Sequence, residues 1–129
     1  MIKALIIDDD PIQLRLAELL IRRSASFGQS MSFTGADEAL NFLGNQENEP
    51  LLPDVILLDL NMPLIDGWTF LNRYAQIRPR MNKKISLFIL SSSIDEKDIL
   101  RSRGFQFVTG YISKPMSPAI LDEIVTQLS

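Results

Sequence analysis

Carboxylate side chains gather where the first apolar run of the sequence ends. The stretch ALIIDDDP, residues 4 to 11, leads from aliphatic residues into Asp8, Asp9 and Asp10. Two carboxylates held about 5 Å apart repel each other by roughly 3 kcal/mol at an effective dielectric constant near 20, which is large beside ordinary folding stabilities. A hard divalent cation such as Mg²⁺ takes carboxylate oxygens as ligands and would offset this repulsion. These residues therefore favour metal-assisted carboxylate chemistry.

Further polar residues follow other apolar runs. Asp59, Ser91 and Lys114 each lie at or just after the end of a predicted strand. In a parallel sheet the C-terminal ends of the strands lie along one edge, and ligands bind there near the switch point in strand order. A short acidic motif alone is often only a solvated loop. Because several strand ends converge at this edge, we expect a ligand-binding site in which Asp59, Ser91 and Lys114 lie close to Asp8 and Asp9.

The residue types that the sequence lacks narrow the chemistry further. Its 129 residues include no histidine and no cysteine, which excludes Ser-His and Cys-His catalysis, histidine metal ligation and disulfides. The formal net charge of -3 argues against nucleic acid as a partner, because nucleic acid usually demands a basic face. No apolar run approaches the roughly 18 residues needed to span a bilayer, and the start lacks the pattern of a signal peptide. We therefore expect a cytoplasmic protein without a membrane partner.

Short apolar runs alternate with longer helical patterns along the chain, which is typical of βαβ units and a parallel sheet. Aliphatic residues are nearly continuous in the runs 3–8 and 54–59, so these strands should be covered on both faces. The length suits a single domain over residues 1–129. In all, five strands are expected, at residues 3–8, 30–35, 54–59, 85–91 and 108–113, with the second and fifth nearer the edges.

Helices are expected between the strands. Asp10 and Ser117 each precede a proline, and both should cap the helix that follows. The segment 45–53 is polar and should be an irregular connection, whereas the aromatic residues after Gly67 should lie in the core or on a helix surface. The expected helices follow Pro11, run from Ala36 to a stop at Gly44, include Phe70 to Ile77, span residues 95–104, and follow Pro118.

The motifs, taken in order, resemble the receiver domain of two-component response regulators. IIDDD, VILLDLNMPLIDGW, FILSSS and GYISKP occur at four strand ends, and the resemblance covers essentially the whole chain. It implies an α/β, CheY-like and flavodoxin-like fold: a doubly wound five-stranded parallel sheet in the order 2-1-3-4-5 with helices on both faces. Because no output domain follows Ser129, we expect a stand-alone regulator.

The resemblance also implies the phosphoacceptor and its metal. Asp59 would accept a phosphoryl group from a sensor histidine kinase or a phosphotransfer protein. Asp8 and Asp9 would be the metal-binding acidic pair. Together with Asp59 and the backbone carbonyl of Asn61, they would hold Mg²⁺ or Mn²⁺.

The remaining implied residues belong to the switch. Ser91 would be the switch hydroxyl, in place of the commoner threonine, and Tyr111 the rotating aromatic. Lys114 would pair with the phosphoryl group and precede a cis proline. Such a protein is a signalling protein rather than an enzyme, and it changes its surface for a downstream protein that the sequence does not identify.

A metal-dependent phosphohydrolase of the haloacid dehalogenase type is the main alternative. IIDDDPI contains an Asp-x-Asp motif, and Ser91 and Lys114 could imitate the later motifs of that family. That family needs a further acidic pair at a strand end, whereas Asp122 and Glu123 fall inside the last predicted helix, and it leaves Asp59 without a task. A flavodoxin-like binding module would need a hydroxyl-rich phosphate loop where this chain has acids. An adaptor that has lost phosphorylation is disfavoured because every chemical residue is present.

Overall fold

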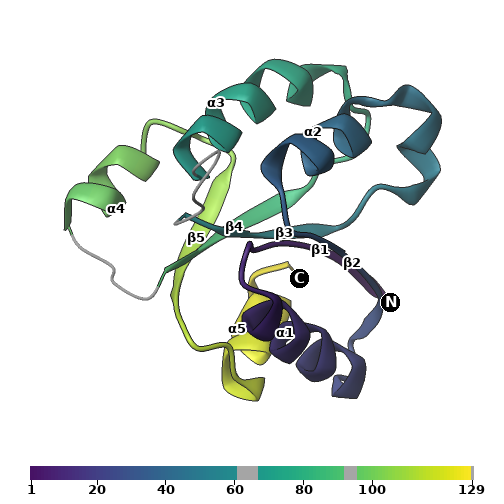
Figure 1. The fold of residues 1–129 in the computed structure, drawn as a ribbon, viewed down its shortest axis with the longest axis vertical. Helices are drawn as coiled ribbons and strands as arrows, with labels where there is room; N and C mark the ends of the chain where they lie inside the picture. Colours follow the sequence, from purple (N-terminus) through teal and green to yellow (C-terminus); the bar gives the residue numbers. More distant parts are fainter. Residues whose placement is uncertain (61–66, 92–95, 129) are drawn as a thin grey trace.

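A parallel sheet forms the centre of the protein. The computed structural model describes residues 1–60, 67–91 and 96–128. Its five strands lie in the order β2-β1-β3-β4-β5, and all neighbours pair in parallel (Figure 1), which confirms the predicted sheet. The strands are β1 (Ile2–Ile7), β2 (Phe27–Phe33), β3 (Val55–Asp59), β4 (Ser86–Ser91) and β5 (Val108–Ser113).

Helices cover both faces of the sheet, as predicted. Helices α2 (Ala36–Gly44), α3 (Gly67–Ile77) and α4 (Glu96–Ser102) lie on one side, and α1 (Pro11–Arg23) and α5 (Pro118–Leu128) lie on the other (Figure 1). Two short 3-10 helices, η1 (Gln46–Leu51) and η2 (Arg78–Arg80), follow α2 and α3. None of the helices in the described part of the chain has the length and apolar composition needed to cross a bilayer.

The aliphatic runs form strands because both of their faces find apolar partners. In β1, Leu5 and Ile7 belong to the core under α2 and α3, whereas Ala4 and Ile6 belong to the core under α1 and α5. All residues of β3 are buried. Each fully buried Leu or Ile side chain stabilises the fold by about 1.5–3 kcal/mol. These two central strands therefore hold the acids at their C-terminal ends in a well-defined place.

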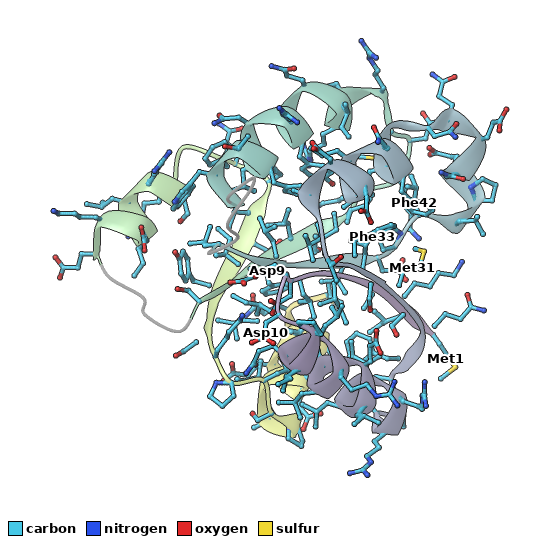
Figure 2. The ribbon with its side chains drawn as sticks, viewed as in Figure 1. Met1, Asp9, Asp10, Met31, Phe33 and Phe42 are labelled. Carbon is cyan, nitrogen blue, oxygen red and sulfur yellow. The ribbon has the colours of Figure 1, made fainter. Side chains whose placement is uncertain are left out.

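The predicted caps are present at two helix starts. The Asp10 side chain accepts a hydrogen bond from the Ile12 backbone N–H at 2.9 Å, directly before Pro11. The Ser117 hydroxyl accepts one from the Ile120 N–H at 3.3 Å. Because a cap defines where a helix begins, the first of these bonds marks the end of the turn between β1 and α1, where Asp9 and Asp10 lie (Figure 2).

The structure differs from the sequence expectation at the start of β2, in the connection 45–53 and at the end of α4, and by one or two residues at several other strand ends. Strand β2 begins at Phe27 rather than at residue 30, because buried Phe27 pairs with Ile2 across a register shift in the ladder. The connection at 45–53 contains η1, whose first turn is capped by a bond from the Glu47 N–H to the Asn45 side chain at 3.0 Å. Helix α4 ends at Ser102, short of residue 104.

Candidate functional site

Three carboxylates meet at the C-terminal edge of the sheet. One oxygen each from Asp8, Asp9 and Asp59 lies within 4.8 Å of the others. Ile7 pairs with Leu58 in the ladder between β1 and β3, so the acids that follow these residues are neighbours. Asp8 and Asp59 are only 2% and 4% exposed, and Asp9 is half-buried. The structure therefore brings together the three acids that the strand pattern placed at this edge.

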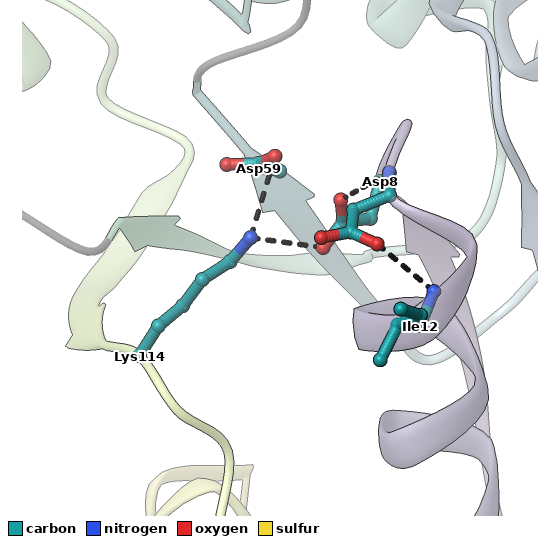
Figure 3. A network of polar contacts seen from close by, with 5 residues as sticks. Asp8, Ile12, Asp59 and Lys114 are labelled. Carbon is teal, nitrogen blue, oxygen red and sulfur yellow. Dashed lines mark hydrogen bonds and ion pairs between the residues drawn. The ribbon is translucent and has the colours of Figure 1, made fainter.

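Lys114 lies against two of these acids (Figure 3). Its Nζ atom is 2.9 Å from Asp8 Oδ2 and 3.3 Å from Asp59 Oδ2. Burial lowers the pKa of Lys114, but the hydrogen bond to Asp8 and the charges of both carboxylates outweigh it, so the pKa lies above its ordinary value of 10.5. The lysine is therefore charged at neutral pH and offsets part of the carboxylate repulsion, a contribution that the sequence analysis had assigned to the metal alone.

Ser91 and Lys114 are held next to each other by backbone contacts. The Lys114 backbone N–H donates to the Ser91 carbonyl at 2.9 Å, and Ser91 is 1% exposed at the end of β4. The peptide bond between Lys114 and Pro115 is cis, as the resemblance implied. Tyr111 pairs with Ile89 in the ladder, two residues before Ser91. Its side chain is half-buried and packs against the core under α2 and α3. Asn61 lies outside the described residues.

Gly67 is a site-forming residue to which the sequence analysis gave no role in the site. Its N–H donates to the Leu60 carbonyl at 2.9 Å. A Cβ atom at this position would lie 2.7 Å from Leu60 Cα and 3.1 Å from the Asp59 carbonyl oxygen. Only glycine therefore lets the start of α3 pack on the end of β3. No local pattern in the sequence indicates this close approach, because it depends on tertiary packing.

The side chains of this edge fit a hard divalent cation. Their ligand atoms are carboxylate oxygens, the type that Mg²⁺ prefers. The three acids and Lys114 leave an excess of two negative charges. The same lysine and the hydroxyl-bearing Ser91 suit an anionic group such as a phosphoryl group beside the metal. The edge can thus bind a cation and an anion side by side.

Comparison with known proteins places the chain in a family. A family model for the response regulator receiver domain matches residues 4–126. The chain belongs to this receiver family. A two-component response regulator from Cytophaga hutchinsonii has a similar crystal structure, with a TM-score of 0.88, 30% identity, and coverage of 98% of this chain and 95% of that one. The phosphorylated cyanobacterial phytochrome response regulator RcpA matches with a TM-score of 0.76 and 30% identity, over 96% of this receiver domain and 88% of RcpA.

A plant protein is also similar in sequence to this chain. The two-component response regulator ORR1 of Oryza sativa is 29% identical over 102 residues, which are 77% of this chain and 43% of the rice protein. The receiver domain thus matches less than half the length of that relative. Together the matches assign the chain to two-component signalling and support the receiver interpretation rather than the haloacid dehalogenase alternative.

Proposed function

We propose that this receiver domain, residues 1–129, accepts a phosphoryl group on Asp59 from a phosphohistidine of a sensor histidine kinase or phosphotransfer protein. One observation carries the proposal: the Asp59 carboxylate ends the central strand β3, with Lys114 Nζ 3.3 Å away and two further carboxylates within 4.8 Å. A phosphorylated relative of 30% identity supports the same chemistry.

The contacts of Asp8 fit a positioning role beside Asp59. Asp8 Oδ1 accepts from the Asp10 N–H at 2.9 Å, and Asp8 Oδ2 accepts from Lys114 Nζ at 2.9 Å. Both oxygens of Asp8 are thus engaged in positioning its own turn and the lysine. Asp59 lies between β1 and β4, where groups from both neighbouring strands can reach a phosphoryl group attached to it.

The transfer itself needs positioning and charge stabilisation more than covalent work by other residues. An Asp59 carboxylate oxygen attacks phosphorus, the bond from phosphorus to the donor histidine breaks, and the histidine nitrogen keeps the electron pair. The Lys114 ammonium pairs with a phosphoryl oxygen and stabilises the charge on the transferring group. Asp8, Asp9 and Asp59 would hold Mg²⁺, which would supply positive charge to offset the negative charge of the transferring group. Attack of water on phosphorus later regenerates the Asp59 carboxylate, so the protein dephosphorylates itself.

Ser91 and Tyr111 would convert phosphorylation into a change of surface. The Ser91 hydroxyl would donate to a phosphoryl oxygen, a contact that only the phosphorylated protein can make. A ligand shifts a conformational equilibrium only through such differential contacts. Because Tyr111 lies on the neighbouring strand two register positions earlier, its side chain would respond to that movement and change the surface around α4 and β5 for a downstream protein.

An apolar stripe on α1 fits the approach of a protein donor. Ile12, Leu16 and Leu19 are 77%, 36% and 37% exposed, and their spacing places them on one helix face. The stripe begins at Ile12, whose backbone N–H donates to the side chain of Asp10, two residues after Asp8 (Figure 3). A donor that brings a phosphohistidine to Asp59 must cover this end of α1. We therefore assign the stripe to docking of the donor protein, whereas a small phosphodonor needs no such surface.

Acetyl phosphate with Mg²⁺ and intact mass spectrometry test the function. The wild type should gain one phosphoryl mass and Asp59→Asn none. A label that persists in Asp59→Asn but disappears in Asp8→Asn would contradict the assignment. Ile12→Glu should accept phosphate from acetyl phosphate at the wild-type rate but from a phosphorylated kinase more slowly. Equal slowing with both donors would refute the docking role of α1.

A further inference from the structure

Trp68 connects helix α4 to the rest of the protein. It is the only tryptophan in the sequence, the second residue of α3, and 8% exposed. The Arg101 guanidinium carbon of α4 lies 4.4 Å from the centre of its ring. The Phe105 ring, in the turn after α4, stacks on the same indole with centroids 6.3 Å apart and an interplanar angle of 26°. Two side chains from one short segment thus hold a single indole.

Helix α4 has few other buried attachments. Of its seven residues, Ser102 alone is buried, and Leu100 is 60% exposed. Helix α3, in contrast, buries five residues, Trp68 among them. A cation over tryptophan is the strongest of the cation–π pairs. The contact with Trp68 therefore attaches the exposed residue Arg101 of α4 to the buried start of α3.

Gly67, the residue before Trp68, packs close to the acid cluster. It is packed on the backbone of β3, where an added Cβ would lie 2.7 Å from Leu60 Cα and 3.1 Å from the Asp59 carbonyl oxygen. The Gly67 N–H also donates to the Leu60 carbonyl at 2.9 Å. Because close-packed interiors transmit displacements, the start of α3 cannot move independently of the end of β3.

We propose that Trp68 couples the acid cluster to helix α4, with Arg101 as the positioning residue that holds α4 against it. The inference rests on the proposed role of Asp59 as phosphoacceptor. The proposed coupling runs from the acid cluster through β3 and α3 to α4. It is separate from the coupling through Ser91 and Tyr111. Coupling is reciprocal, so loosening α4 from Trp68 must change the affinity of the acid cluster for a phosphoryl group or its mimic.

Arginines two positions apart provide matched variants. Arg101→Met keeps much of the length of the side chain but removes the cation, and Arg101→Lys keeps the charge but loses the planar stack. Arg103→Met removes the same charge nearby. Arg103 is exposed, and within the described part of the chain its guanidinium lies over no aromatic ring.

The experiment is a titration of the four proteins with beryllofluoride and Mg²⁺. Calorimetry measures the affinity, and Trp68 fluorescence reports on the indole. The wild type should bind with a change in Trp68 emission. Arg101→Met should shift the dissociation constant by about two- to fivefold, the factor expected for a partly exposed cation–π contact, and should alter the emission change. Arg101→Lys should shift it in the same direction, and Arg103→Met should match the wild type.

Two outcomes would overturn the inference in distinguishable ways. If all four proteins bind beryllofluoride with the same affinity and the same emission change, Trp68 has a structural role only and the coupling is refuted. If neither calorimetry nor Trp68 fluorescence detects binding of beryllofluoride to the wild type with Mg²⁺, the proposed function of Asp59 fails and the coupling fails with it.

Discussion

Replacing Lys114 by methionine should destabilise the protein by about 3–4 kcal/mol at pH 7 in the absence of metal. Lys114 Nζ lies 2.9 Å from Asp8 Oδ2 and 3.3 Å from Asp59 Oδ2, and the three side chains are 15%, 3% and 6% exposed. Removing one partner of a buried ion pair typically costs about 3–5 kcal/mol, because the remaining charge stays buried without compensation. Because the pKa of Lys114 is raised, the lysine stays charged and this stabilisation is present in the wild type at pH 7; it is lost as the pH rises above about 10.5.

The cost in Lys114→Met should depend on pH. A carboxyl group with an intrinsic pKa near 4 can be protonated for about 1.4 kcal/mol per pH unit above that value. Protonating one carboxylate in the folded variant therefore costs about 4 kcal/mol at pH 7, but only about 1.5 kcal/mol at pH 5. Because the folded variant takes up a proton that the unfolded chain does not, its stability falls as the pH rises. The difference from the wild type should shrink to about 1–1.5 kcal/mol at pH 5.

Urea unfolding at pH 5 and pH 7 in EDTA measures this difference. Lys83→Met is the matched control, because Lys83 Nζ is 3.0 Å from Asp54 Oδ1 in a pair whose side chains are 32% and 38% exposed. Exposed pairs contribute at most about 1 kcal/mol. Burial raises the pKa of Asp54, but hydrogen bonds from Lys3 and Lys83 outweigh it and leave it below 3.8, so the control should change little between pH 5 and pH 7. A Lys114→Met protein as stable as the wild type at pH 7, or equally destabilised at both pH values, would refute the reasoning.

Three further predictions concern the metal, the switch and the core. Mg²⁺ at ten times its dissociation constant should stabilise the wild type by about 1.4 kcal/mol, and Asp9→Ala should lose this response; a wild-type melting temperature that does not change with Mg²⁺ would contradict the site. Ser91→Ala should still be phosphorylated but gain little partner affinity with beryllofluoride, and a full wild-type gain would place the switch elsewhere. Burial raises the pKa of Tyr74 to about 12 despite the nearby Arg78 charge, so stability is lost as the pH rises from about 10 to 12. At pH 11 the wild type should therefore have lost about 1.4 kcal/mol relative to Tyr74→Phe, and equal alkaline urea curves would contradict this.

The sequence was sufficient to predict the sheet edge and the residues on it. The aliphatic run before Asp8 and the one before Asp59 could be placed because both are buried on two faces, so every position is apolar. Parallel pairing then puts their ends together without knowledge of any side-chain conformation. The Asp10 cap was likewise predictable, because its bond to Ile12 spans only two residues.

The individual side-chain contacts between distant segments could not be predicted in this way. Lys114 and Asp8 are 106 residues apart, and their ion pair depends on how a long side chain turns at the sheet edge. The stacking of Arg101 on Trp68 depends on where a short helix lies, which no periodicity in the sequence specifies. The start of β2 was misplaced because an edge strand needs few apolar residues, and Phe27 is its only fully buried residue.

The most direct test of the central claim is to identify the phosphorylated residue chemically. The protein is incubated with acetyl phosphate and Mg²⁺, reduced with borohydride, which converts an aspartyl phosphate to homoserine, and mapped by peptide mass spectrometry. Homoserine should appear at position 59 and be absent from a sample without acetyl phosphate. Homoserine at position 8 or 9, or at no position while intact mass shows a bound phosphoryl group, would contradict Asp59 as the phosphoacceptor.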